Sequence, residues 1–116
     1  PWLIAAGDEA LAVAALWDVW RAREEDEALL SCTLITTGAA ESFKPWHSRM
    51  PVLLTAPERK RWLDNGQRIG SDDTLFDPVL KQPLRLVPLD PSVGNSRHKD
   101  PAVLQAQGEW VELDGD

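Results

Sequence analysis

Apolar residues fall into short runs along the 116-residue chain, and turn-forming or charged residues separate these runs. Short apolar or β-branched runs bounded by Gly, Pro, Asn and Asp are typical of strands. Strands are therefore predicted at Trp2–Ala6, Ala10–Trp20, Leu29–Thr37, Val52–Leu54 and Leu84–Val87, with weaker ones at Val93–Asn95 and Trp110–Leu113. The Ala-rich segment 10–20 also suits a helix, but the turn at residues 7–9 favours a hairpin with the strand before it.

Two short helices are predicted between the strands. Residues Gly38–Pro45 carry enough helix-forming side chains for one short helix that ends before the proline. Thr55 and Glu58 have the spacing of a capping box, which starts a helix that continues to Asp64. The pattern as a whole predicts an α+β fold with mostly antiparallel strands, in a single domain that covers residues 1–116. No strand, glycine-rich loop and helix of the nucleotide-binding kind is present.

The composition is that of a folded, soluble domain, with 43% hydrophobic and 27% charged residues. No apolar run approaches the ~20 residues that a membrane-spanning helix needs, so no membrane partner is expected. Cys32 is the single cysteine, which excludes an internal disulfide and indicates a reducing compartment. Because Cys32 lies inside an apolar run, we expect a buried, inert thiol.

The formal net charge of −7 argues against a nucleic-acid surface that covers the whole domain. The basic residues are clustered, however, at Lys44–Arg49, Arg59–Arg61 and Arg97–Lys99. A local basic patch is therefore compatible with the acidic chain. The chain starts at Pro1 and Trp2 already belongs to a predicted strand, so we expect it to be the C-terminal part of a longer protein.

The segment from Thr36 to Arg49 holds the candidate chemistry. The spacings of the two His and one Cys match no zinc motif, so neither a metal nor another cofactor is expected. His47 can give and take a proton near neutral pH, and the planar guanidinium of Arg49 suits a phosphate. In an extended segment the two side chains point the same way. The alternative is a His47 that caps the preceding helix and an Arg49 in a surface ion pair.

Two neighbours of this pair could belong to the same site. Trp46 follows a proline and precedes His47, so its ring could stack on a base, although packing in the core is the simpler interpretation. Thr36 closes the strand before the segment, and Thr is common in strands without any functional role.

The order of the motifs resembles the SOS-response-associated peptidase (SRAP) family. The similar segments are Ala14–Trp20, with its Leu-Trp-Asp-Val-Trp, the strand Cys32–Thr37, the His-Ser-Arg-Met-Pro-Val of His47–Val52, the helix segment Arg61–Leu63, Val93–Asn95 and Asp100–Pro101. The matches keep their order along most of the chain.

The resemblance implies an α+β fold built on a curled, barrel-like antiparallel sheet. It also implies binding of single-stranded DNA and covalent capture of abasic sites, by a thiazolidine formed on a Cys at the processed N-terminus. Peptidase or lyase-type activity would accompany this role in the DNA damage response. By the resemblance, His47 assists proton transfer on the sugar, Arg49 holds a phosphate, and Thr36 lies in the same pocket.

The chain departs from the family pattern in its N-terminal part. No Cys stands at its start, and Cys32 matches a structural position of the family and not the nucleophile. The resemblance therefore makes the chain roughly the second half of the domain, inactive alone, with the N-terminal half as its partner. It implies a bacterial-type cytoplasmic protein that joins the nucleoid when it is bound to DNA. The alternatives are a non-catalytic DNA-binding module and an acidic structural or interaction domain.

Overall fold

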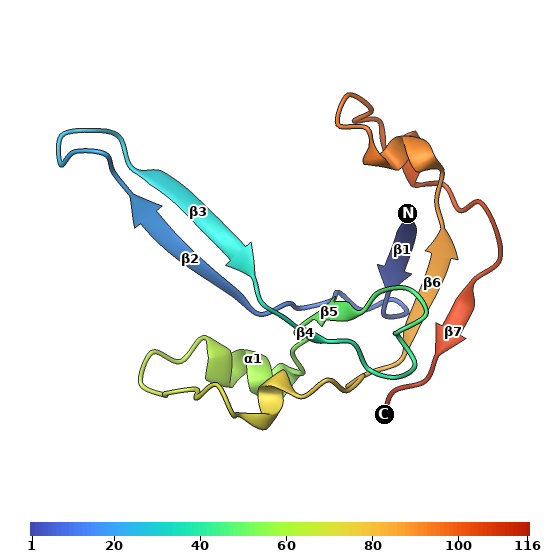
Figure 1. The fold of residues 1–116 in the computed structure, drawn as a ribbon, viewed down its shortest axis with the longest axis horizontal. Coiled ribbons are helices and arrows are strands. Elements are labelled where there is room, and N and C mark those ends of the chain that lie inside the picture. The colour runs from blue at the N-terminus through green and yellow to red at the C-terminus, as the bar shows by residue number, and fades with distance from the viewer. The chain divides into compact units, whose positions relative to one another are not determined.

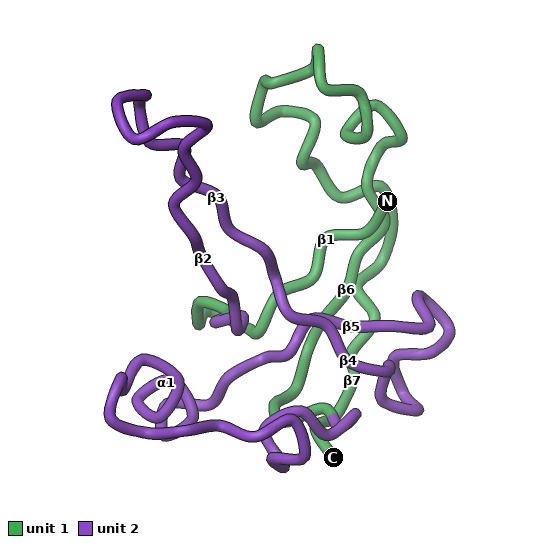
Figure 2. The backbone as a smooth tube through the Cα atoms, turned by 60° about the vertical axis from the view of Figure 1, so that its left-hand side comes forward, with its two compact units in different colours: residues 1–11, 80–116 green, residues 12–79 purple.

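The computed structural model describes all residues, 1–116, as an α+β arrangement with antiparallel strand pairs (Figure 1). The chain divides into two compact units, residues 1–11 with 80–116 and residues 12–79 (Figure 2). The predicted fold class, α+β with mostly antiparallel strands, is confirmed, and the sheets of these 116 residues do not close into a barrel. The single domain of the sequence analysis stays a prediction.

The first unit is built on a three-stranded antiparallel sheet. Its strands are β1 (Trp2–Ala5), β6 (Leu84–Pro88) and β7 (Val111–Leu113), in the order β1-β6-β7. The central strand β6 carries the buried side chains of this sheet, including the fully buried Leu86 and Val87. Strand β6 is paired on both edges, so its backbone is removed from solvent. The burial of its apolar side chains makes this arrangement favourable.

Two strand predictions are wrong in this unit and at its border. The first strand pairs with β6 and not with the following segment, because the backbone groups of Ala12 and Ala14 bond instead to Leu54 and Val52. The weak strand at Val93–Asn95 falls on a short 3-10 helix, η2 (Pro91–Gly94). The Asp90 carboxylate accepts the Ser92 N–H at 2.8 Å, and this cap, with a proline in the first turn, starts a helical turn. A second such turn, η3, spans Pro101–Leu104.

The second unit contains two separate strand pairs and the helix. Strands β2 (Ala15–Trp20) and β3 (Leu29–Leu34) form one antiparallel hairpin, and β4 (Thr36–Gly38) pairs with β5 (Arg49–Pro51). Figure 1 shows β2 and β3 side by side, with the connecting loop at the far end of the hairpin. Helix α1 (Ala56–Trp62) and the short 3-10 helix η1 (Thr74–Phe76) complete the unit.

Three segments of this unit are joined by a closed ring of backbone hydrogen bonds. The Ala14 N–H donates to the Val52 carbonyl, the Val52 N–H to the Ile35 carbonyl, and the Ile35 N–H to the Ala14 carbonyl, each at 2.9 Å. Ile35 is the residue at which the predicted strand Leu29–Thr37 changes partner, from β2 to β5. The single predicted strand is therefore observed as β3 and β4.

The core of the second unit is centred on this ring. Ala14 and Val52 are buried together with Leu54 and Leu75. Ala12, Ile35, Trp62, Ile69 and Phe76 pack around them while partly exposed. The Trp62 indole N–H also donates to the Ala15 carbonyl at 3.1 Å, which ties α1 to the start of β2.

Local chemistry explains which helix predictions held. The Glu58 carboxylate accepts the Thr55 N–H at 2.8 Å, as the capping box requires, and α1 follows at once. The predicted helix at Gly38–Pro45 is instead a series of turns over residues 41–46. The chain must reverse there, because β5 pairs antiparallel with β4 and the Ala39 N–H donates to the Ser48 carbonyl at 3.0 Å.

Two further expectations require correction. Residues Val52–Leu54 are buried as predicted, but the strand precedes them as β5, and Leu53 makes only an isolated bridge to Val13. Cys32 is exposed and not buried, because its strand lies in the β2–β3 hairpin, whose side chains are open to solvent.

The ion pair between Arg61 and Asp73 fixes the segment after α1. Arg61 Nη2 lies 2.6 Å from one carboxylate oxygen of Asp73, while the other oxygen accepts the Leu75 N–H at 2.9 Å. The hydrogen bond with Asp73, and then the attraction of its charge, raises the pKa of Arg61, so the guanidinium stays charged at neutral pH.

Replacement of Asp73 should therefore cost more stability than replacement of Arg61. Asp73→Ala removes the ion pair and the cap on η1, whereas Arg61→Ala removes the ion pair alone. Loss of a helix-capping acceptor costs about 1 kcal/mol, and the two variants should differ by that order in urea unfolding. Equal unfolding midpoints for the two variants would contradict this assignment.

Candidate functional site

The β4–β5 ladder separates its side chains into a buried face and an exposed face. Thr37 and Met50 point inward: the Thr37 hydroxyl donates to the Phe76 carbonyl at 2.7 Å, and Met50 is 4% exposed. Because side chains alternate along a strand, Thr36 and Arg49 lie on the outward face, and both are exposed. The buried neighbours thus fix the backbone that presents the two polar residues.

Arg49 is held in place by Thr36. Its Nε and Nη2 atoms donate to the Thr36 hydroxyl oxygen at 3.1 and 3.0 Å, and Nη2 also donates to the Thr36 carbonyl at 2.9 Å. The ion pairs of the structure join Lys44 to Glu41 and Arg61 to Asp73. The predicted alternative of an ion pair for Arg49 is therefore wrong.

The binding of Arg49 to neutral oxygens has an electrostatic consequence. No carboxylate compensates the guanidinium charge, and Nη1 donates to no protein group. Arginine in a fixed orientation with free donors is suited to bind a phosphate or carboxylate through charge-assisted hydrogen bonds. The outward face of the ladder is thus a candidate anion-binding surface.

His47 is held against the backbone of Arg49. The Arg49 N–H donates to His47 Nδ1 at 3.0 Å, and the Arg49 carbonyl oxygen lies 2.9 Å from the same ring atom. A neutral Nδ1 can accept from the N–H, and a protonated Nδ1 can donate to the carbonyl, so the ring has a local partner in either state. No hydrogen bond of the structure engages Nε2, and the residue is exposed. This arrangement suits an imidazole that exchanges a proton through Nε2.

Trp46 is partly buried beside the same segment. Its ring lies 6.4 Å from that of Phe43, at an interplanar angle of 41°. Phe43 is 5% exposed and anchors the turn over residues 41–46. The packing of Trp46 on Phe43 agrees with the simpler interpretation of this residue, which is partly exposed.

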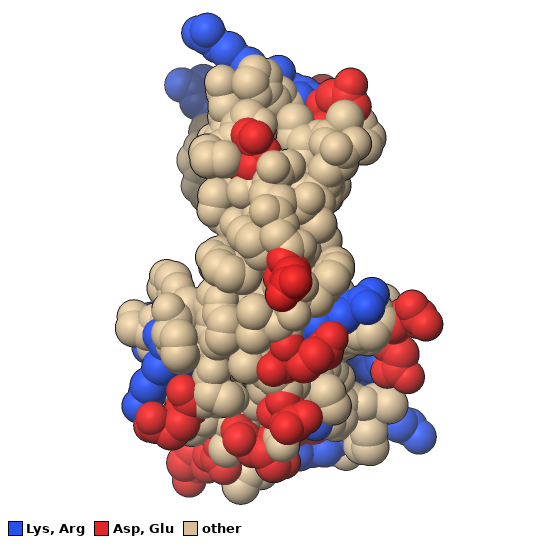
Figure 3. Space-filling model, turned by 90° about the vertical axis from the view of Figure 1, so that its right-hand side faces the viewer, with Lys and Arg blue, Asp and Glu red and all other residues tan.

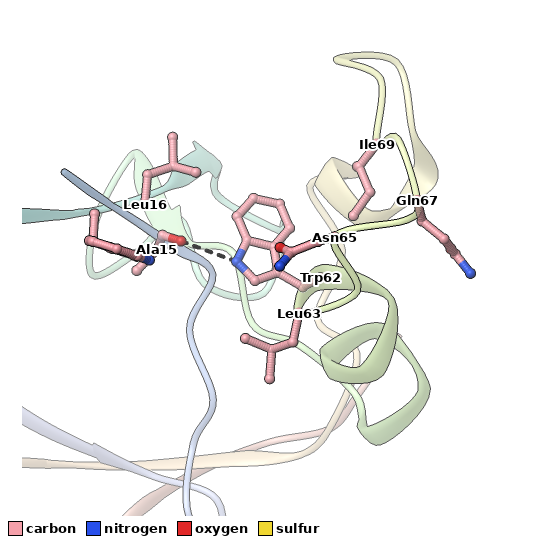
Figure 4. Close-up of a pocket in the computed structure, with 8 residues that line it drawn as sticks. Ala15, Leu16, Trp62, Leu63, Asn65, Gln67 and Ile69 are labelled. Atoms are coloured by element: carbon pink, nitrogen blue, oxygen red, sulfur yellow. Dashed lines mark hydrogen bonds between the residues drawn. The ribbon is translucent and has the colours of Figure 1, made fainter.

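The structure thus connects Thr36, His47 and Arg49 by direct hydrogen bonds, with Trp46 next to them in the chain. A hollow of this unit lies elsewhere, at the contact of α1 and its following loop with β2 (Figure 4). In it the Trp62 indole points at the Ala15 carbonyl, with Leu63 and Asn65 nearby. None of the four predicted site residues lines it, and the only signal for it in the sequence is the helix stop at Asn65.

Charge is mixed over the molecular face shown in Figure 3, where acidic side chains lie beside basic ones. That face carries no continuous basic groove. No helix combines the length and the apolar character that crossing a membrane would require. No group of three or more potential metal-binding side chains occurs among residues 1–116.

The family model described as SOS response associated peptidase (SRAP) matches residues 1–96. The chain belongs to the SRAP family. This confirms the resemblance drawn from the motifs between Ala14 and Asn95.

Curated SRAP relatives are named abasic site processing proteins. The chain is 31% identical over 102 residues to HMCES of Xenopus tropicalis, covering 86% of this chain and 30% of the relative. It is 29% identical over 97 residues to YoqW of Bacillus subtilis (strain 168), covering 82% of this chain and 42% of the relative. The chain thus spans well under half the length of these relatives. No solved structure matches it.

The two adjacent threonines of β4 should respond differently to the loss of the hydroxyl. Thr37→Val removes a part-buried hydrogen bond to the Phe76 carbonyl and should lower the unfolding free energy by about 1 kcal/mol. Thr36→Val, at an exposed position, should leave stability nearly unchanged but remove the acceptor of the Arg49 Nε–H, while Nη2 keeps its bond to the Thr36 carbonyl. Faster solvent exchange of the Arg49 Nε–H by NMR, in Thr36→Val alone, is the expected signature. An unchanged Arg49 signal in Thr36→Val would contradict the site geometry.

Proposed function

We propose that this chain forms the part of an SRAP domain that binds single-stranded DNA at abasic sites and assists their covalent capture by the complete protein. One observation supports the proposal above the others. The Arg49 guanidinium is held by the neutral oxygens of Thr36, and the Arg49 backbone N–H donates to His47, whose Nε2 is free. The names of the relatives, abasic site processing proteins, support the same substrate.

The proposed role of Arg49 is to bind a DNA backbone phosphate. Thr36 holds the guanidinium so that its free donors face solvent, and no carboxylate competes with the phosphate. This pre-orientation reduces the side-chain entropy lost on binding. Trp46, whose ring is partly exposed, would stack on a neighbouring base.

The proposed role of His47 is proton transfer at the abasic sugar. In the reaction that the family resemblance implies, the amine of an N-terminal Cys outside these residues adds to the sugar aldehyde. Water then leaves and the thiol closes a thiazolidine ring. His47 would donate a proton to the departing oxygen through Nε2 and recover one when the thiol adds, so the imidazole is unchanged over the whole reaction. Because the proposed substrate is DNA with abasic sites, we also propose a cytoplasmic location, with the nucleoid when the protein is bound to DNA.

A covalent-capture assay tests the role of His47. Protein made from the complete reading frame, with its native N-terminus, is mixed with a labelled single-stranded oligonucleotide that carries one abasic site. A protein–DNA band should survive heat and detergent, and His47→Ala should slow its formation by about 10²-fold, as is usual for a lost general acid–base.

Two controls make the capture assay specific. The exposed neighbour variant Ser48→Ala should form the band at the original rate, and an intact oligonucleotide should form none. Salt-dependent binding without a covalent band would contradict the enzyme and leave a non-catalytic DNA-binding module. An equal rate for His47→Ala and Ser48→Ala would contradict the role of His47.

The salt dependence of binding tests the role of Arg49. A protein that loses one phosphate contact on single-stranded DNA should lose about 0.7 from the slope of log affinity against log salt. We expect this loss for Arg49→Ala, measured by fluorescence anisotropy with an oligonucleotide that carries a stable abasic analogue. Arg68→Ala, which removes an exposed arginine from the loop after α1, is the matched control. Equal slopes for the two variants would contradict the phosphate site.

A further inference from the structure

One face of the β2–β3 hairpin lacks polar and charged side chains, whereas the other is mixed. The antiparallel register pairs Ala15 with Leu34, Trp17 with Cys32, and Val19 with Leu30. Paired residues share a face, so one face, the apolar face hereafter, consists of Ala15, Trp17, Val19, Leu30, Cys32 and Leu34. The opposite face is mixed: Asp18 pairs with Ser31 and Leu16 with Thr33, while Trp20 pairs with Leu29 near the loop.

The apolar face is open to solvent in this chain. Trp17 is 72% exposed, Leu30 69% and Leu34 60%. Strands β2 and β3 contact chiefly each other, and each has a second edge with no strand partner. An isolated two-stranded hairpin is marginally stable, and a contiguous exposed apolar patch is typical of an interaction surface.

The chemistry of the apolar face restricts what can cover it. No Lys or Arg occurs among the twelve residues of β2 and β3, so the surface lacks the positive charge that binding of nucleic acid requires. Its alternation, apolar on one face and mixed on the other, is the pattern of a strand pair with one side in a protein core. These features favour an apolar polypeptide as the occupant.

We propose that the apolar face is covered by a strand-forming apolar segment of an SRAP domain that lies outside these 116 residues. The match covers 30% of the Xenopus tropicalis relative and 42% of the Bacillus subtilis relative, so most of each relative's length lies beyond it. Such a segment would pair with a free hairpin edge and bury Trp17 and Leu30. The proposal rests on family membership and the exposed face, and it is independent of the proposed DNA chemistry.

Cys32 is a built-in reporter of this covering. It is the only cysteine of the chain, it is exposed, and its side chain lies on the apolar face opposite Trp17. Thiol alkylation of the protein made from the complete reading frame, without DNA, is followed by mass spectrometry of the peptide that contains Cys32. The alkylation rate of Cys32 should be lower by about two orders of magnitude than that of an exposed thiol. A buried thiol reacts only when the segment that covers it opens.

The reference thiol is Ser96→Cys, at an exposed position of the other unit, alkylated in the same sample. Leu30→Glu should restore fast alkylation of Cys32, because it places a charge in the covered face, whereas Ala22→Glu in the exposed loop should not. Far-UV circular dichroism checks that both variants are folded.

Two results would overturn the proposal. One is a Cys32 that reacts as fast as Cys at position 96 in the folded, complete-frame protein. The other is protection that disappears on dilution, which would identify a second copy as the occupant. Neither outcome depends on DNA, so a failed capture assay with protected Cys32 would count against the proposed function alone.

Discussion

The ring of backbone hydrogen bonds through Ala14, Val52 and Ile35 is the constraint on which the second unit depends. Its three carbonyls and three N–H groups satisfy one another, and Ala14 and Val52 are almost completely buried. An unpaired buried N–H or carbonyl is costly, so the three segments cannot separate without losing all three bonds and the core around them. The β2–β3 hairpin and the β4–β5 ladder both start from this junction.

The exposed polar site follows from this buried junction. Because the strand changes partner from β2 to β5 at Ile35, the next residue, Thr36, pairs with Pro51 on the same face as Arg49, and its hydroxyl holds the guanidinium. The turn anchored by Phe43 returns the chain so that His47 meets the Arg49 backbone. The site needs few polar residues of its own, since buried apolar residues fix its geometry.

Part of this arrangement could be predicted from the sequence. Strand alternation, the capping box before α1 and the motif from His47 to Val52 depend on neighbours in the chain, and local pattern indicates them. The change of partner at Ile35 could not be predicted, because a β-branched apolar residue looks the same whichever strand it bonds. The absence of a carboxylate beside Arg49, and the exposure of Cys32, likewise depend on tertiary contacts between distant segments.

The most direct test of the account is an NMR titration of the complete-frame protein with a single-stranded oligonucleotide that carries a stable abasic analogue. The account predicts that the Arg49 Nε–H and the His47 ring signals shift together and saturate with the binding curve. Binding that leaves both signals unchanged at saturation would contradict the assignment of the β4–β5 face as the DNA site.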